Sequence, residues 1–460
     1  MILARVLVVA ALSERAFLPT VPVHADTTPA WLEAYREPAR QLVAEALSDS
    51  FAWRRLALLT DTAAPRLSGT PQLDRAIQWA VDEMKRDGLE NVHTERVMVP
   101  RWVRGRESAE IVEPAPHAIA MLGLGNSIGT PPEGIRAEVL VVRSFEELDA
   151  RRAQARGRIV LLNAPFTNYA ESRVYRSAGP SRAASYGAVA LLIRSLGPPG
   201  LRLPHTGYLQ YVSGTPPVPA AAIATEDADR LQRMSDRGSR VVARLLMEAH
   251  FEPDVESANV VGELQGSEKP HELVVVGGHL DSWDVGAGAS DDGGGCIVTW
   301  EALRLMKKLG LRPRRTVRVV LWTNEENGTR GAQAYRDAHR AELANHVLML
   351  ESDTGVFRPT GFGFTGTARA SETVRTIASL LHSIGADRIT PEGEGADIGP
   401  SVRVARIPAM SLNVEGDYFL IHHTAADTVD KIDPVEMAKC AAAVAVMTYV
   451  VADIPQRLGN

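Results

Sequence analysis

Hydrophobic residues in the first hundred positions recur at helical spacing and then change to strict alternation. Residues 31–89 are largely helical in pattern, which predicts helices over residues 42–58 and 72–84. Gly88 lies just past the second helix, where a helix end favours glycine. Residues 91–99 alternate between apolar and polar side chains, as a half-buried strand does. This part of the chain therefore combines helices with a strand.

Between residues 131 and 250 the pattern changes to short apolar runs separated by turns rich in glycine and proline. Two short helical stretches accompany these runs, which indicates a compact α/β unit inserted into the chain. The runs expected to be strands are residues 137–142, 158–162, 189–193 and 221–224.

Strands and helices alternate regularly after residue 251. Such alternation favours a mainly parallel twisted sheet flanked by helices, so the chain is assigned to the α/β class. In sheets of this kind, ligands bind at the carboxyl ends of the strands. The expected order is a strand at 273–277, a helix at 293–309, a strand at 317–322, a helix at 331–343 and a strand at 347–351.

Length and composition are those of a globular protein with more than one folding unit. A chain of 460 residues exceeds the size at which one core keeps growing, and 45% hydrophobic with 23% charged residues is ordinary for such a protein. The net charge of −6 provides no basic field for nucleic acid or anionic lipid. After the N-terminal segment, no stretch approaches the roughly 18 apolar residues of a membrane span. We therefore expect no nucleic-acid or membrane partner.

The N-terminal segment and the cysteines bear on cellular location. Residues 1–25 resemble a signal peptide, because Arg5 precedes an apolar run and Ala25 ends a possible cleavage site. A frayed tail is the alternative, since polar residues and prolines interrupt the run. Export predicts a secreted or periplasmic protein. Cys296 and Cys440 are too few for a disulfide framework and lie in apolar helical patterns, so we expect free, buried thiols.

Histidines and carboxylates follow the predicted strands at the points where those strands end. A rigid strand end can hold charged side chains at a rim that solvent reaches. The three strands are followed by GGHLDSWDVGAGASDDGGG, WTNEENG and LESDTG, and a late loop reads DYFLIHHTAADT. These segments contribute His279, Asp281, Asp291, Glu325, Glu326, Asp353 and His423.

This combination of residue types suits a pair of zinc ions. Imidazoles and carboxylates are common zinc ligands, and three protein ligands per ion leave a position for water and substrate. Two neighbouring ions need a carboxylate that contacts both, which one aspartate can supply, and a water between them becomes acidic enough to attack near neutral pH. Of the adjacent Glu325 and Glu326, one can bind a metal while the other accepts the proton of that water. Asp281, two residues after His279, can accept the spare imidazole hydrogen.

The chain resembles the family of co-catalytic zinc aminopeptidases along nearly its whole length. The matching segments are PRLSGTPQLDRAIQW, LGLGNSIGTPPEGI, GGHLDSWDVGAGASDDGGG, LWTNEENG, LESDTG, GEGADI and IHHTAADT. The resemblance implies a zinc exopeptidase fold with two Zn²⁺ per chain. It also implies that Glu325 is the general base and that Asp281 orients His279.

The same resemblance implies the ligand sets and the domain organisation. His279 and Asp353 would hold one zinc, Glu326 and His423 the other, and Asp291 would bridge them. In its segments 157–160, 182–188 and 217–220, the inserted unit looks like a protease-associated domain. Such modules usually cover or shape an active site without doing chemistry. The resulting division is a signal peptide at 1–25, a catalytic domain in two parts at 26–130 and 251–460, and the insert at 131–250.

Five further polar residues have less certain roles. Asp292 is expected to act at the start of the following helix, because adjacent residues point in different directions. His422 is expected to pack or support the site. His205 reads as a surface histidine, with reach over the cleft as the alternative. Asp397 is a candidate for binding a free amine in the substrate pocket, and Asn327 has no interpretation from the sequence.

The function expected from these residues is hydrolysis of dipeptides and short peptides at a free terminus, of the dipeptidase or aminopeptidase type. Carboxypeptidase action of the glutamate carboxypeptidase type is one alternative. A non-catalytic binding ectodomain like that of the transferrin receptor is another, and it would lack a full ligand set. Acyl transfer of the glutaminyl cyclase kind, with a single zinc, is a third. The resemblance also suggests a homodimer.

Overall fold

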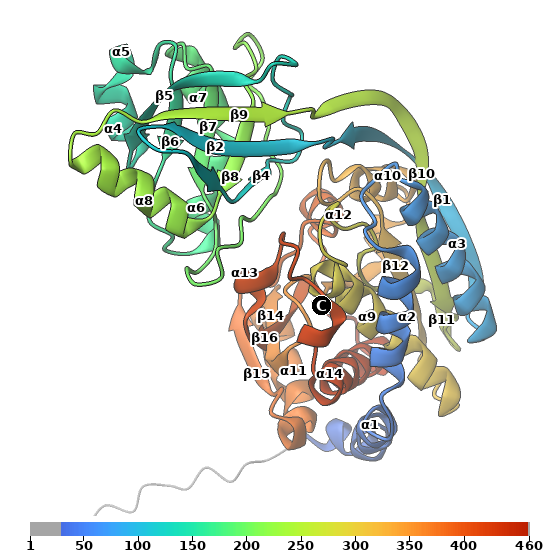
Figure 1. The fold of residues 1–460 in the computed structure, drawn as a ribbon. Coiled ribbons are helices and arrows are strands. Elements are labelled where there is room, and N and C mark those ends of the chain that lie inside the picture. The colour runs from blue at the N-terminus through green and yellow to red at the C-terminus, as the bar shows by residue number, and fades with distance from the viewer. Residues whose placement is uncertain (1–28, 459–460) are drawn as a thin grey trace, which may run out of the picture.

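The computed structural model describes residues 29–458 as two sheets, each with its own helices, that are connected by a long ribbon (Figure 1). Strands β1 (Glu90–Val103) and β10 (His250–Leu264) pair antiparallel to form this ribbon. The chain leaves the larger body on β1, forms the smaller body over residues 104–249, and returns on β10. The expected signal peptide lies outside the described residues.

The larger body is built on an eight-stranded sheet with the order β1-β10-β12-β11-β13-β16-β14-β15. The neighbouring pairs from β12 to β16 are parallel, whereas β10 and β14 pair antiparallel with β12 and β16. The prediction of a mainly parallel sheet is confirmed at its centre. The remaining strands are β11 (Lys269–His279), β12 (Arg315–Trp322), β13 (His346–Glu351), β14 (Arg358–Thr365), β15 (Arg388–Pro391) and β16 (Ala409–Glu415).

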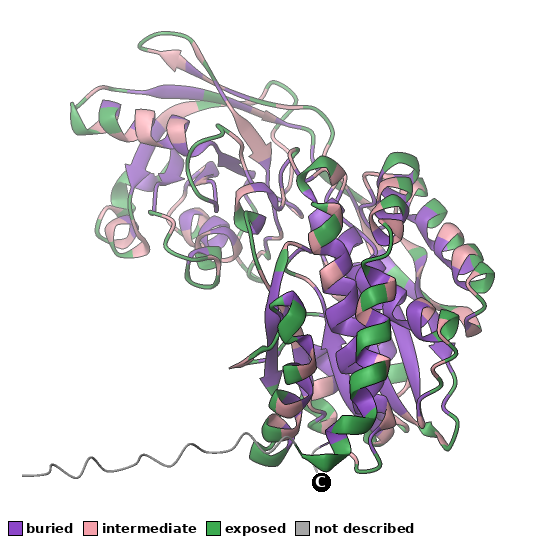
Figure 2. Ribbon diagram, turned by 90° about the horizontal axis from the view of Figure 1, so that it is seen from below, coloured by how far each residue is buried: buried purple, intermediate pink, exposed green. Residues whose placement is uncertain are grey.

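Helices cover both faces of this sheet, because successive strand residues point to opposite sides. Val274 and Val276 of β11 join the core under α1, α2, α3, α9, α11 and α14, and Val275 joins the core under α10 and α12. Figure 2 shows these buried strands between helices that keep exposed outer faces. The helices are α1 (Glu33–Ala46), α2 (Phe51–Ala63), α3 (Pro71–Arg86), α9 (Gly294–Lys308), α10 (Arg330–Ala338), α11 (Ala368–Ala378), α12 (Gly399–Ala405), α13 (Tyr418–Ile421) and α14 (Pro434–Asp453).

Helix α14 corrects the expectation that no stretch after the N-terminal segment approaches a membrane span. Its length and mean hydropathy of 1.6 would suffice to cross a membrane. In the structure, however, 83% of that window is buried, and the helix packs on α1, α9 and the sheet. A helix that is apolar all round needs an apolar environment on every side, which the core of a large body supplies.

The helix predicted over residues 42–58 is two helices. Helix α1 ends at Ala46 and α2 begins at Phe51. The Oγ of Ser48 donates to the carbonyl of Glu45, and the carboxylate of Asp49 accepts the backbone N–H of Phe51. Short polar side chains compete with helical hydrogen bonds in this way, so they end one helix and begin another.

The smaller body begins earlier than residue 131. Its sheet has the order β3-β2-β9-β5-β6-β7-β8-β4, and strands β2 to β4 precede the predicted boundary. They belong here because Ala109 and Ile111 of β2 are buried against β9. All four predicted strands are present. The strands are β2 (Glu107–Glu113), β3 (His117–Ile119), β4 (Met121–Gly123), β5 (Ile135–Val142), β6 (Ile159–Leu162), β7 (Ala190–Arg194), β8 (Ala220–Ile223) and β9 (Val242–Met247).

Five helices, rather than two, accompany this second sheet. Several are only one or two turns long, which leaves little periodicity in the sequence. Helix α6 matters most for the site, because it faces the larger body. The five are α4 (Phe145–Ala150), α5 (Arg152–Ala155), α6 (Tyr169–Ser177), α7 (Gly179–Ser185) and α8 (Thr225–Asp236).

Candidate metal centre

The side chains predicted to carry chemistry meet at the carboxyl edge of the parallel strands. His279 is the last residue of β11, and Glu325 and Glu326 follow β12. Asp353 follows β13, and His423 comes two residues after α13 ends. Because the parallel strands end at the same edge, residues far apart in the sequence become neighbours.

Asp291 lies between two imidazoles. Its Oδ1 is 3.3 Å from Nε2 of His279, and its Oδ2 is 3.2 Å from Nε2 of His423. Nε2 of His279 is also 3.3 Å from Oδ1 of Asp353, and Nε2 of His423 is 3.3 Å from Oε2 of Glu326. These contacts gather two imidazoles and three carboxylates around Asp291.

Charge and burial make this cluster a site for cations. Burial, together with the neighbouring Asp291, raises the pKa of Glu326 to about 7. Burial also raises the pKa of Asp353. The Oδ2 of Asp291 is buried and accepts no hydrogen bond from the residues of the described chain. Carboxylates that are desolvated and close together need positive charge between them, and imidazole and carboxylate donors fit a zinc ion.

Asp292 acts at the start of helix α9, as predicted, by accepting a hydrogen bond from its first turn, although it lies close to His279 and Asp353. Its Oδ1 accepts the N–H of Gly295 at 3.0 Å, and its Oδ2 accepts the N–H of His279 at 3.1 Å. Both carboxylate oxygens are therefore engaged by backbone donors. Asp291 is the better candidate for a bridging ligand.

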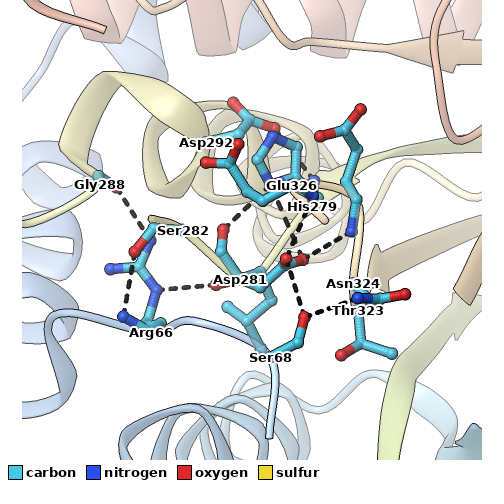
Figure 3. Close-up of polar contacts among 12 residues, drawn as sticks. Arg66, Ser68, His279, Asp281, Ser282, Gly288, Asp292, Thr323, Asn324 and Glu326 are labelled. Carbon is cyan, nitrogen blue, oxygen red and sulfur yellow. Dashed lines mark hydrogen bonds and ion pairs between the residues drawn. The ribbon is translucent and has the colours of Figure 1, made fainter. Parts of the chain in front are cut away.

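Asp281 orients His279 in a different way from the one predicted. Nδ1 of His279 is 3.0 Å from the backbone carbonyl of Asp281 and 3.9 Å from its carboxylate. That carboxylate instead accepts the backbone N–H groups of Glu325 and Glu326, at 3.1 and 3.3 Å. It also accepts the hydroxyl of Ser68 at 3.2 Å, as Figure 3 shows. Asp281 thus fixes the paired glutamates as well as the histidine.

Arg66 supports the site from the N-terminal part of the chain. Its guanidinium is fully buried and donates to the carbonyls of Leu280, Ala287 and Gly288 at 2.7 to 2.9 Å (Figure 3). These hydrogen bonds shape the loop between His279 and Asp291. The PRLSGT motif predicts no role for Arg66, since only a tertiary fold shows which carbonyls the arginine meets.

Asp427 is a second supporting residue that the sequence analysis missed. Its carboxylate accepts the N–H and hydroxyl of Ser290, at 2.7 and 2.9 Å, and the N–H of Asp291 at 3.1 Å. Burial raises the pKa of Asp427 to about 6. The motif IHHTAADT places this aspartate four residues after His423, which was a usable signal.

Asn324 and Asn327, on either side of the paired glutamates, are linked by hydrogen bonds that hold the glutamate loop. Asn324 donates to the side-chain oxygen of Asn327 at 2.5 Å and to the hydroxyl of Ser68 at 3.1 Å. The carbonyl of Asn327 accepts a hydrogen bond from Asn126 of the smaller body at 3.3 Å. Asn327, which had no interpretation from the sequence, therefore connects the glutamate loop to the other body.

Three of the less certain residues are buried. His205 is not on the surface: it is 3% exposed, and its Nε2 is 3.2 Å from the carbonyl of Phe419. His422 packs among aromatic rings, and neither ring nitrogen has a partner within residues 29–458. Asp397 is 1% exposed, while its neighbour Ala396 lines the cavity. Asp397 itself is not among the residues that line the cavity.

A cavity of about 390 Å³ lies over the cluster and is lined by both bodies. The larger body contributes the acidic floor, and the smaller body contributes basic and aromatic side chains. A volume of this size suits a small ligand. The lining residues used below are Tyr169, Arg173, Arg176, Glu325, Glu326 and Asp353.

Several known proteins are similar to this chain in sequence and in fold. The model of peptidase family M28 matches residues 259–448. Carboxypeptidase Q of Homo sapiens is 48% identical over 406 residues, which cover 88% of this chain and 86% of that protein. Carboxypeptidase Q of Mus musculus is 46% identical over 428 residues, which cover 92% and 91%. A solved structure of a peptidase M28 precursor from Shewanella amazonensis SB2B has a TM-score of 0.89 at 33% identity and covers 93% of this chain and 98% of its own. The chain therefore belongs to peptidase family M28 and is a metallopeptidase.

Proposed function

We propose that this chain is a two-zinc exopeptidase that hydrolyses dipeptides and short peptides. The observation that carries the proposal is the position of Asp291, with one carboxylate oxygen toward each of two imidazoles. His279 and Asp353 complete one ligand set, and Glu326 and His423 complete the other. Together with Asp291, each set would provide three protein ligands to an ion, the number that leaves a position for water and substrate in catalytic zinc sites.

Glu325 is the proposed general base. Bound zinc supplies an acidic water and polarises the substrate carbonyl. Glu325 lines the cavity, and its carboxylate forms no hydrogen bond with any described residue. Burial raises the pKa of Glu325 well above its usual range, so this carboxylate holds a proton more tightly than one in water. Such a group can take the proton of the attacking water and return it to the leaving amine.

Helix α6 supplies the proposed anchor for a free carboxylate. Its residues Tyr169, Arg173 and Arg176 all line the cavity. The guanidinium of Arg176 is already engaged in hydrogen bonds within the protein, because it donates to the hydroxyl of Tyr169 at 2.8 Å and to the carbonyl of Tyr208 at 3.1 Å. Arg173 is exposed and makes no hydrogen bond or ion pair with any described residue. A guanidinium in this position suits bidentate binding of a terminal carboxylate, so it favours peptides whose unblocked carboxyl end reaches the cavity.

Peptides blocked at one end test this proposal. A free dipeptide, its N-acetyl form and its C-terminal amide would be incubated with the zinc-loaded enzyme, and the products identified. We expect cleavage of the free dipeptide and slower cleavage of the amide. Efficient cleavage of the acetylated form would instead favour a carboxypeptidase, as the name of the relatives suggests.

Arg173→Ala sharpens the test. It should raise KM for free dipeptides by about 10-fold or more, as loss of a charge-assisted bidentate contact does, and leave the amide unaffected. Arg156→Ala is a matched control, because Arg156 is exposed on the same body and does not line the cavity. An equal effect of Arg173→Ala on free and amidated substrates would refute the anchor.

Metal analysis separates the enzyme from a non-catalytic ectodomain. The enzyme should carry about two zinc ions per chain, whereas a binding ectodomain should carry none. We also propose that the protein is exported to the medium or the periplasm and that it forms a homodimer. Both statements rest on the sequence alone. Cell fractionation and sedimentation of the purified chain would test them.

A further inference from the structure

A short segment of the smaller body holds the loop that carries His423. Nε2 of the buried His205 is 3.2 Å from the carbonyl of Phe419, and its Nδ1 is 2.6 Å from the hydroxyl of Ser195. The next residue, Thr206, donates its N–H to the carbonyl of His423 at 2.9 Å. We call His205 and Thr206 the clasp.

The clasp also provides the acceptor for the ring of His423. Nε2 of this ring faces Asp291 and Glu326, so a proton on the ring belongs on Nδ1 when Nε2 binds a cation. The carbonyl of Thr206 is 3.3 Å from Nδ1. Arg176, at 3.4 Å, offers only donors and cannot accept that proton.

The two imidazoles of the site therefore depend on different parts of the molecule. Nδ1 of His279 faces the carbonyl of Asp281, within the larger body. Nδ1 of His423 faces Thr206, which belongs to the smaller body. The hydrogen bond at the second imidazole nitrogen fixes the tautomer and orientation of a metal ligand, and its loss commonly weakens metal binding 10- to 100-fold.

The packing leaves little freedom at this contact. His423 has a φ of 61°, in the left-handed region that a bulky residue seldom adopts unless its surroundings hold it. Gly207 has a φ of 130°, and a Cβ there would lie 2.8 Å from Nδ1 of His423. The glycine thus lets the backbone of the clasp approach the imidazole.

We propose that the clasp is a positioning device through which the smaller body sets the affinity of the metal position formed by Glu326 and His423. The position formed by His279 and Asp353 does not depend on it. This inference rests on the ligands of the proposed function. It predicts that the two ions differ in their response to a change in the smaller body.

Two substitutions at one residue test the clasp. His205→Leu removes the hydrogen bond to Phe419, while His205→Gln keeps an N–H donor at similar reach. Each protein would be loaded with zinc, dialysed against graded chelator and analysed for metal. We expect the wild type and His205→Gln to lose their ions at similar chelator concentrations. In His205→Leu one ion should leave at a concentration about 10- to 100-fold lower, and the other should remain.

Controls separate positioning from a general loss of stability. His346→Leu removes a second buried histidine, which contacts Tyr335 away from the cavity, and should shift neither ion. Ser195→Ala frees Nδ1 of His205 with a smaller change and should act in the same direction, which covers the case that His205→Leu does not fold. Equal weakening of both ions, or no change in either, would overturn the proposal. If the wild type binds two ions but cleaves no peptide, the proposed function fails while the clasp is still measured.

Discussion

At the scale of single residues, the adjacent Glu325 and Glu326 lie in different surroundings. The backbone N–H groups of Glu325 and Glu326 are both held by Asp281, yet their carboxylates have different surroundings. Glu326 accepts the N–H of Trp283 at 3.1 Å and faces His423. Glu325 faces the cavity. These different surroundings support the proposed roles, with Glu326 as a metal ligand and Glu325 as the base.

Glu325→Gln tests this division. The change keeps the size of the side chain but removes its ability to accept a proton, so turnover should fall by about a hundredfold or more. The zinc content should stay at the wild-type value, because Glu325 is no proposed ligand. Steady-state kinetics and metal analysis on the same preparation check both points. Glu326→Gln is the contrasting variant, and it should lose metal. Near-normal turnover of Glu325→Gln would show that another group is the base.

At the scale of elements, a charged network ties helix α10 to the ribbon. His339 follows α10, and its Nε2 is 2.6 Å from Oε1 of Glu95 in β1. Burial alone would lower the pKa of His339, but the hydrogen bond to Glu95 and the negative charges of Glu95 and Glu342 together raise it. Burial would also raise the pKa of Glu95, but the same hydrogen bond and the nearby positive charges, including that of Arg318, together lower it. The ion pair thus stabilises the fold in a limited pH window.

The window follows from the direction of each shift. The contribution of His339 is complete below its usual pKa and disappears as the pH rises through the raised value. The contribution of Glu95 is present above its usual pKa and disappears as the pH falls through the lowered value. Between these limits both groups are charged. The pair is partly screened from solvent, with side chains 16% and 15% exposed.

His339→Gln should therefore destabilise the protein most at mildly acidic pH. We expect a loss of about 1.5–3 kcal/mol near pH 6, as for a hydrogen bond to a charged group, and a smaller loss near pH 9. Unfolding by urea at both pH values measures this. His382→Gln is a control, because the side chain of His382 is 86% exposed and its pair with Asp387 should contribute little. A loss that does not change with pH would contradict this account.

At the scale of the whole molecule, two bodies close over one cavity. The larger body holds the proposed ligands, and the smaller body supplies Arg173, Asn126 and the clasp. Arg104, just after β1, strengthens the junction: it forms an ion pair with Asp284 at 2.6 Å and donates to the carbonyl of Gly123. The junction is therefore made of directed polar contacts close to the site.

Removal of metal should lower the stability of the whole fold. Without cations, the buried carboxylates of the cluster repel one another, so a chelator should lower the midpoint of thermal unfolding and zinc should restore it. A ligand at 1,000 times its dissociation constant adds about 4 kcal/mol to the free energy of unfolding. Scanning calorimetry measures the shift. In Asp291→Asn, added zinc should raise the midpoint far less. An identical midpoint with and without chelator in the wild type would argue against a bound metal.

The sequence by itself determined the α/β class, the strands that end in chemistry and the residue types at those ends. These are local properties, because apolar runs and alternating patterns specify a strand wherever it lies. The convergence of His279, Asp291, Glu326, Asp353 and His423 then follows from parallel strands that end at one edge. The sequence pattern did not predict the break between α1 and α2, because the break depends on capping by short polar side chains. It also did not predict the early start of the smaller body, because β2 is placed there by its pairing with the distant strand β9.

Only the tertiary structure decided which atoms contact the ring nitrogens of His279 and His423 and hold the loops of the site. The carbonyl rather than the carboxylate of Asp281 faces His279, and the carbonyl of Thr206 faces His423. Carbonyls are present at every residue, so no pattern of side chains can reveal which one is used. Arg66 and Arg173 are equally ordinary as sequence letters. Arg66 is buried against three carbonyls, whereas Arg173 is exposed and lines the cavity, because the fold brings different surroundings to the same guanidinium group.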